Sequence, residues 1–246
     1  VDATGELKPE AMERVVRAID GFIAVRDSLS TPDHPVVRTV AVATSAARDA
    51  RNAAEFAARL RERGIELSVI PGSREAALSF SGASIDFSGE RLMVVDVGGG
   101  STEVVMGMGG VEPVCAHSFN VGCRRVTEKF LASDPPAPEE LARARAWIHE
   151  KMASWFAEQS KEAADLERVV AVAGTATTVV SIRDRMETYD SSRVHKARVS
   201  RQELLEVYER LAALPLSKRM QARPQARARD GRGASHPPRS ARFRRH

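Results

Sequence analysis

A short glycine-rich turn lies between an aspartate and a glutamate in the middle of the chain. Residues 91–107 read RLMVVDVGGGSTEVVMG, with strand-forming residues before Asp96 and after Glu103. Three consecutive glycines weaken a β-strand, but they allow positive φ angles and close approach of the backbone to a ligand. Backbone amides and hydroxyls in such a turn can bind phosphate oxygens. The candidate phosphate-binding residues here are Gly98, Gly99, Gly100, Ser101 and Thr102.

Asp96 and Glu103 flank this turn and offer hard oxygen ligands of the kind that Mg²⁺ prefers. A dinucleotide-binding loop would need a third glycine at position 103 and a helix after it, and a Walker A loop would need a lysine followed by Ser or Thr. Neither pattern is present. An ordinary tight hairpin with a polar tip stays open as the alternative.

A second candidate phosphate segment is Gly174-Thr175, which follows the apolar run ERVVAVA and opens a helix. The run is apolar enough for a strand that is buried on both faces. Capping of the helix N-terminus is the simpler role for Thr175, and it can coexist with a phosphate contact.

The first ninety residues alternate between helical and strand patterns, which is typical of a parallel sheet covered by helices. Apolar positions from Met12 to Ile23 follow the spacing of one buried helix face. The expected order is a helix from Pro9, a strand over 36–43, a long helix from Ser45 to Gly64, a strand over 65–70 and a helix around 75–80.

From Arg91 the pattern changes to antiparallel strands. Three strands are expected around the glycine turn, followed by a helix from Gly122 to Phe130 and a long amphipathic helix that begins at Pro138. After the second phosphate segment, 188–199 is expected to be loop, and a helix is expected from Arg201 to Leu214.

Charge is distributed unevenly along the 246 residues. Eight arginines lie in residues 221–246, and without that segment 37 basic residues fall to 29 and 33 acidic residues to 32. We therefore expect a disordered arginine-rich tail and no nucleic-acid binding by the folded part. The sequence has no transmembrane run or signal peptide, and two cysteines without metal spacing predict a reducing, cytoplasmic location.

Several stretches together resemble the exopolyphosphatase/guanosine pentaphosphate phosphatase family of the actin–Hsp70–sugar kinase superfamily. DVGGGSTE is similar to its second phosphate loop, and VAVAGTATT to its third. ATSAAR, PGSREAALSFSGA, VGCRRVTEKF and YDSSRVHKARVS resemble further family segments, in the family's order. The resemblance runs from about Thr4 to about Met220.

This resemblance implies an α/β fold with two actin-like (ribonuclease H-like) domains that face a cleft, the first incomplete. It implies residues 1–90 as partial domain I and 91–220 as domain II, and the arginine-rich tail expected from composition follows at 221–246. It also implies Mg²⁺-dependent removal of terminal phosphate from inorganic polyphosphate or guanosine pentaphosphate. By position, Glu75 matches the catalytic carboxylate and Arg48 a phosphate-binding arginine, while Asp96, Gly98 and Glu103 match the phosphate and metal loop.

Each of these residues also has a simpler explanation. Glu75 in a first helical turn is favourable through the helix dipole, and Arg48 could be a solvated surface cation. His195 is expected to make a structural hydrogen bond, and Arg125 to lie either near the cleft or at the surface. The alternative functions are an actin-like ATPase or sugar kinase, and a non-catalytic polyanion binder. Assembly as a homodimer stays open as an alternative to a monomer.

The sequence departs from the family at three places. The family's first phosphate loop is expected upstream of Val1, so we expect little phosphatase activity from these 246 residues alone. Arg74 stands in place of an acid, and Lys196 in place of a glycine. The tail differs from the family's continuation, and we interpret it as a shifted reading frame.

Overall fold

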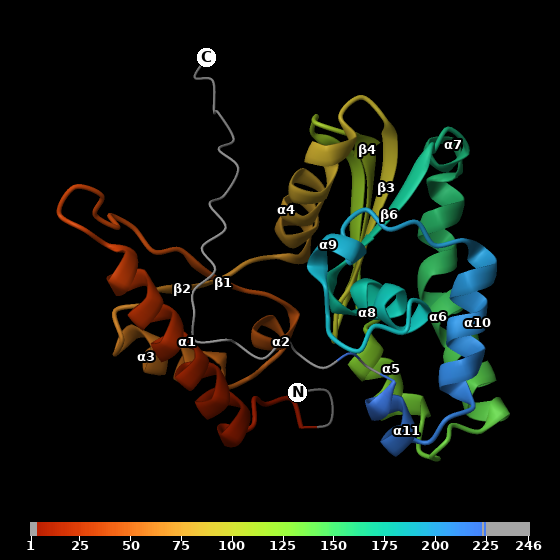
Figure 1. The fold of residues 1–246 in the computed structure, drawn as a ribbon, viewed down its shortest axis with the longest axis horizontal. Coiled ribbons are helices and arrows are strands. Elements are labelled where there is room, and N and C mark those ends of the chain that lie inside the picture. The colour runs from red at the N-terminus through yellow and green to blue at the C-terminus, as the bar shows by residue number, and fades with distance from the viewer. Residues whose placement is uncertain (1–3, 223, 225–246) are drawn as a thin grey trace.

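The computed structural model describes residues 4–222 and Pro224, and it contains two sheets. The smaller sheet pairs β1 (Ala41–Ala43) with β2 (Leu67–Val69) in parallel. The larger sheet has four strands in the order β5-β4-β3-β6. Figure 1 shows the smaller sheet with α1 (Pro9–Leu29) and α3 (Ala53–Arg61), apart from the larger sheet and its helices.

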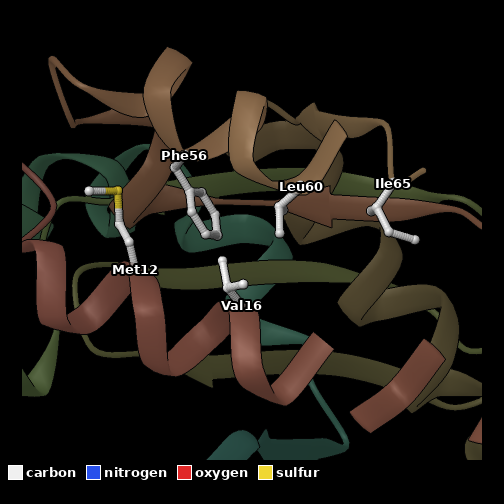
Figure 2. Close-up of a cluster of buried hydrophobic side chains, with 5 residues drawn as sticks. All are labelled: Met12, Val16, Phe56, Leu60 and Ile65. Atoms are coloured by element: carbon white, nitrogen blue, oxygen red, sulfur yellow. The ribbon is translucent and has the colours of Figure 1, made fainter. Parts of the chain in front are cut away.

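Two helices form the core of the N-terminal part. The predicted apolar face of α1 (Pro9–Leu29) packs against α3 (Ala53–Arg61). Figure 2 shows that the side chains of the two helices interdigitate. Ile65, which leads into β2, belongs to the same cluster. The buried cluster consists of Met12, Val16, Phe56, Leu60 and Ile65.

Two predictions about this part are wrong in their extent. The strand predicted over 36–43 is formed only at β1, and Val37 is 90% exposed. Strand-forming residues need a neighbouring strand, and β1 pairs only with the short β2. The predicted helix from Ser45 breaks after α2 (Ser45–Arg48), because the side chain of Asn52 exchanges hydrogen bonds with the backbone of Leu7 at 2.8 and 3.0 Å.

The larger sheet confirms the predicted antiparallel strands. β3 (Arg91–Val97), β4 (Thr102–Met108) and β5 (Pro113–Phe119) form an antiparallel meander, and β6 (Arg168–Val172) joins β3 in parallel. The register places Asp96 directly opposite Glu103. Because opposite residues of paired strands point to the same face, the two carboxylates lie on one side of the sheet.

Helices cover both faces of this sheet. On one face, α4 (Gly72–Ser84) places Ala76 and Phe80 against Val105 of β4. On the other face, Val104 and Met106 pack with aromatic side chains of α6 (Pro138–Glu158). Val105 points to the opposite face from Val104 and Met106, because successive side chains of a strand alternate between the two faces of the sheet. The one-turn η1 (Ile85–Phe87) joins α4 to β3, while α5 (Cys123–Phe130) precedes α6 and α7 (Ser160–Ala164) follows it.

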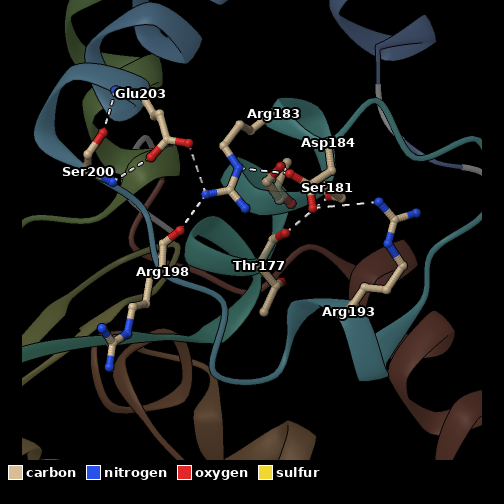
Figure 3. A network of polar contacts seen from close by, with 9 residues as sticks. Thr177, Ser181, Arg183, Asp184, Arg193, Arg198, Ser200 and Glu203 are labelled. Carbon is tan, nitrogen blue, oxygen red and sulfur yellow. Dashed lines mark hydrogen bonds and ion pairs between the residues drawn. The ribbon is translucent and has the colours of Figure 1, made fainter.

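The C-terminal described part consists of helices. α8 (Ala173–Arg183) is followed by α9 (Ser191–Val194), a single turn inside the predicted loop, and by α10 (Arg201–Ala212) and α11 (Leu216–Gln221). Figure 3 shows that the Arg183 guanidinium reaches the Arg198 carbonyl and the carboxylates of Asp184 and Glu203. Glu203 also forms a capping box with Ser200, so the same residues begin α10 and attach it to α8.

The division into domains at residue 90 stays a prediction. α4 precedes that boundary, yet it packs on the four-stranded sheet that follows it. The disordered tail predicted over 221–246 begins too early, because Gln221 is the last residue of α11, and residues 223 and 225–246 lie outside the described part. Within the described part of the chain, none of the helices is both long enough and apolar enough to cross a membrane.

Candidate functional site around the glycine loop

The glycine loop Gly98–Ser101 is held by the first turn of α5. The carbonyl of Gly98 accepts a hydrogen bond from the Cys123 amide at 3.0 Å. The carbonyl of Gly99 accepts from the amides of Arg124 and Arg125 at 3.0 and 3.1 Å. The Arg125 side chain adds a bond from Nε to the Gly100 carbonyl at 2.9 Å. Three consecutive carbonyls of the loop therefore face α5.

This arrangement turns the loop amides away from α5. In a trans peptide the N–H points opposite to the preceding C=O, so the amides of Gly99, Gly100 and Ser101 face the other side. Within residues 4–222, none of these three amides has a protein acceptor assigned to it. Free, convergent amides of this kind bind anions. The phosphate loop predicted from the sequence is thus compatible with the observed backbone.

The two hydroxyl residues that follow the glycines lie at the end of the loop and at the start of β4. Ser101 and Thr102 are both buried, and the Thr102 hydroxyl donates to the Val121 carbonyl. The Thr102 proton is therefore engaged with the protein. Its structural effect is to hold the start of β4 against the segment that leads into α5.

Two serines bind the carboxylates that flank the loop. Ser79 of α4 donates to Asp96 at 2.9 Å, and Ser118 of β5 donates to Glu103 at 2.6 Å. Glu103 is only 1% exposed, and its one assigned hydrogen-bond donor among the described residues is neutral. A buried carboxylate is costly without a positive partner. The position of Glu103 therefore favours a bound cation.

Glu75 lies in the first turn of α4, beside Arg48 at the end of α2. The Arg48 guanidinium lies 3.7 Å from Glu75 Oε2 and donates to the Ile70 carbonyl at 3.0 Å. Glu75 Oε2 is itself buried and has no hydrogen-bond partner in the described part of the structure. The structure thus brings together the two residues that the sequence resemblance marks as catalytic.

The surroundings of Glu75 raise its pKa above the ordinary value of a glutamate. Burial is the largest cause, and the nearby carboxylates of Glu103 and Asp96 raise the pKa further. The Thr44 hydroxyl and the Arg48 guanidinium act in the opposite direction. Three carboxylates from three different elements therefore influence one another, although they are far apart in the sequence.

The N-terminus of α4 can approach the sheet because its first residue is a glycine. A Cβ atom at Gly72 would lie 2.5 Å from the Cβ of Ser118, the residue that binds Glu103. Gly100 of the loop is similarly close to Ser45 of α2, because a Cβ at Gly100 would lie 2.7 Å from the Ser45 hydroxyl. These two contacts bring Glu75 and Arg48 to the glycine loop.

The second predicted phosphate segment lies next to the same loop. The Thr175 hydroxyl donates to the Val97 carbonyl at 2.9 Å, which joins the start of α8 to the end of β3. Ala173 immediately before it has φ 67°, a left-handed conformation that is unfavourable for alanine. A Cβ at Gly174 would meet no atom within 4 Å, so the backbone there is open.

The donor chemistry of the site fits Mg²⁺ held jointly with a substrate. Among residues 4–222, no group of three or more His, Cys, Asp or Glu side chains forms a protein metal cage. Mg²⁺ usually binds one or two carboxylates and completes its shell with water and substrate phosphates. Asp96 and Glu103 are such a pair, and the buried environment of Glu103 supports the fit.

Not every residue singled out in the sequence belongs to this site. His195 Nε2 lies 3.2 Å from Asp86 of η1, and Lys196 Nζ lies 2.8 Å from the same carboxylate. This agrees with the structural role expected for His195. Sequence reasoning missed the serines that bind Asp96 and Glu103, because serine is common and gives no signal until its partner is known.

The fold and the site define an actin-like α/β protein with a glycine loop beside a group of carboxylates. Residues 1–230 match the Ppx/GppA phosphatase family, and the chain belongs to this family of hydrolases. It is 37% identical over 235 residues to "Exopolyphosphatase 2" of Mycobacterium tuberculosis, covering 91% of this chain and 70% of that protein.

Comparison with solved structures finds proteins of the same family. The crystal structure of an exopolyphosphatase-like protein matches with a TM-score of 0.79 and 33% identity, over 91% of this chain and 70% of that one. The Aquifex aeolicus member of the Ppx/GppA family matches with a TM-score of 0.69 and 28% identity, over 89% and 69%. The fold class and the family predicted from the sequence are confirmed.

Proposed function

We propose that this protein removes the terminal phosphate from inorganic polyphosphate by hydrolysis. The observation that carries the proposal is the partly buried Glu75 carboxylate, with its raised pKa, near a loop in which, within residues 4–222, the amides of Gly99, Gly100 and Ser101 have no protein acceptor. A general base is most effective when its pKa is close to the working pH, and burial moves Glu75 in that direction. The similarity to "Exopolyphosphatase 2" of Mycobacterium tuberculosis supports polyphosphate as the substrate.

In the proposed mechanism, the amides of Gly99 and Gly100 bind oxygens of the terminal phosphoryl group, and Arg48 stabilises its charge. Glu75 orients a water molecule and accepts its proton as the water oxygen forms a bond to phosphorus. The bond between phosphorus and the bridging oxygen breaks, and the shortened polyphosphate leaves with the electron pair. Positioning and charge stabilisation supply most of the acceleration in such reactions.

Magnesium is part of the proposal. Asp96 and Glu103 would hold Mg²⁺, which supplies positive charge to the phosphate oxygens when it is bound. The serines that bind these carboxylates would orient them, as partners of ligand side chains commonly do. Thr175 would complete the phosphate site from α8.

Guanosine pentaphosphate is the alternative substrate, because it carries the same kind of terminal phosphoanhydride and is one of the two substrates that the sequence resemblance implies. An ATPase or sugar kinase would act on ATP instead. A polyanion binder would retain polyphosphate without turnover.

The deciding experiment, like the other activity measurements below, uses the protein with the upstream phosphate loop expected from the family resemblance restored. It measures phosphate release from polyphosphate, guanosine pentaphosphate and ATP under identical conditions, with and without Mg²⁺. We expect the highest kcat/KM for polyphosphate and little release from ATP. A higher kcat/KM for guanosine pentaphosphate would identify that compound as the preferred substrate. ATP turnover would favour the kinase-like alternative. Binding without release from any of the three would rule out the enzyme.

A further inference from the structure

Asp49 connects the Arg48 segment to the glycine loop, although the two are far apart in the sequence. Asp49 is the first residue after α2, and its Oδ2 accepts from the Ser45 hydroxyl at 3.3 Å and from Arg125 Nη2 at 3.1 Å. The Asp49 and Arg125 side chains are 32% and 21% exposed. The pair joins residues 76 positions apart.

Arg125 continues this connection into the loop. Its Nη2 binds Asp49, while its Nε donates to the Gly100 carbonyl at 2.9 Å. A carbonyl held in this way points the next amide, that of Ser101, toward the opposite side. Gly100 also packs closely against α2, because a Cβ added there would lie 2.7 Å from Ser45 Oγ.

The physical need for Asp49 follows from the flexibility of arginine. An arginine side chain loses about 1.5–2 kcal/mol of rotamer entropy when it is fixed, so each additional bond to its guanidinium helps to hold it in one place. A carboxylate that binds the same guanidinium fixes the second side of the planar group. Since Asp49 follows Arg48 directly, it also ties the phosphate-binding arginine to the loop.

We propose that Asp49 is a positioning residue, which holds Arg125 against the Gly100 carbonyl and fixes the distance between the loop amides and Arg48. The inference rests on the proposed function, because its consequence is tighter binding of the terminal phosphates. The pair is partly exposed, so its contribution to stability is small. Its loss should therefore change binding more than melting temperature.

The test compares Asp49→Asn with Asp20→Asn in the full chain. Asp20 is a matched control, because it binds Arg63 at 2.7 Å and joins α1 to the end of α3. Calorimetry with inorganic tripolyphosphate should show about fivefold weaker binding for Asp49→Asn and none of this loss for the control. Asp49→Glu keeps the charge and should recover part of the affinity.

Hydrogen exchange of a peptide that covers residues 98–101 provides a readout independent of substrate. Exchange should be faster in Asp49→Asn than in the parent, and unchanged in Asp20→Asn. In an Arg125→Ala background, Asp49→Asn should have no further effect, as expected for two residues that act through one contact. Phosphate release should show a raised KM with kcat within about twofold, because the loop binds substrate and transition state alike.

Unchanged tripolyphosphate binding and unchanged exchange in Asp49→Asn would overturn the positioning role. That outcome is distinct from failure of the proposed function, which would appear as unchanged phosphate release in Glu75→Gln. An equal loss of affinity in Asp20→Asn would also overturn the role of Asp49, since it would show a general effect of removing an ion pair.

Discussion

Glu75 is a residue whose local environment opposes its charge. The two sources of this opposition, burial and the neighbouring acids, would both be relieved by a cation or by a proton. This combination is common where a carboxylate has to accept a proton during a reaction. Burial and the neighbouring acids raise the pKa of Glu75, which suits a general base. They also make the ionised Glu75 side chain unfavourable for the stability of the folded protein.

The first prediction concerns turnover. Glu75→Gln should lower kcat for polyphosphate by at least about a hundredfold, because glutamine keeps the size of the side chain but cannot take the proton from water. Binding should stay within a few-fold of the parent. The measurement is phosphate release, with calorimetric binding as the control for folding. A variant with nearly unchanged kcat would remove Glu75 from the mechanism.

The second prediction concerns stability and pH. A carboxyl group whose pKa is raised on folding stabilises the folded state below its unfolded pKa, and that stabilisation is lost as pH rises through the folded pKa. At pH 7.5 the charge of Glu75 is therefore unfavourable, and Glu75→Gln should raise Tm by about 2 °C. The gain should shrink toward pH 4. An equal gain at both values, or a gain in the exposed control Glu66→Gln, would contradict this explanation.

The third prediction concerns the metal. Asp96→Asn should raise the Mg²⁺ concentration needed for half-maximal phosphate release by about tenfold, because a neutral amide is a weaker ligand for a hard cation. Asp184→Asn is the control, since Asp184 is bound by Arg183 at 2.8 Å at the other end of α8. If both variants keep the Mg²⁺ requirement of the parent, Asp96 does not hold the ion.

Sequence reasoning found part of this site and missed part of it for one physical reason. The short turn fixes the register of β3 and β4, so Asp96 and Glu103 are paired by local sequence alone. Glu75 and Arg48 have no such local constraint, and only the resemblance to a family identified them. Ser79, Ser118 and Asp49 have neither signal, because each acts through a residue distant in sequence.

At the scale of elements, α5 is as much a part of the proposed phosphate site as the glycine loop, because it holds the loop in place. Its first-turn amides are satisfied by the loop carbonyls and are not free for an anion. The sequence predicted α5 within one residue of its observed bounds, but it gave no indication of this use. The predicted lengths of the strand at β1 and of the helix at α2 were wrong because both elements end where contacts with other elements require it.

The fourth prediction tests the contact between α5 and the loop. A Cβ at Gly122 would lie 2.3 Å from the Gly99 carbonyl oxygen, so Gly122→Ala must move the loop or α5. We expect tripolyphosphate binding to weaken by about tenfold or more, with a loss of about 1–3 kcal/mol in stability. The measurements are calorimetry and chemical denaturation.

Gly21→Ala is the matched control for this substitution. A Cβ at Gly21 would meet no atom within 4 Å, and Gly21 lies inside α1. Alanine should stabilise that helix by about 1 kcal/mol and leave phosphate binding unchanged. Normal binding by Gly122→Ala would show that the loop tolerates displacement, and that its amides are not the phosphate ligands.

At the scale of the whole molecule, the candidate site is assembled from both sheets and from α4 between them. Arg48 and Asp49 follow β1 of the small sheet, the glycine loop joins β3 to β4 of the large sheet, and Glu75 begins the connecting helix. A relative movement of these parts would change the distance between Arg48 and the loop amides. Substrate that contacts all three would stabilise one arrangement.

The last prediction separates this site from the basic tail as the source of polyphosphate affinity. Deleting residues 223–246 removes eight arginines, so a tail-based binder would lose affinity and most of its dependence on salt. A site built around Glu75 and the glycine loop should keep its KM within about twofold. The measurement is KM for polyphosphate between 50 and 300 mM salt, with a full-length control in which the eight arginines are replaced by serine. A large rise in KM in both variants, together with a flat salt dependence, would place substrate binding in the tail and contradict the site described above.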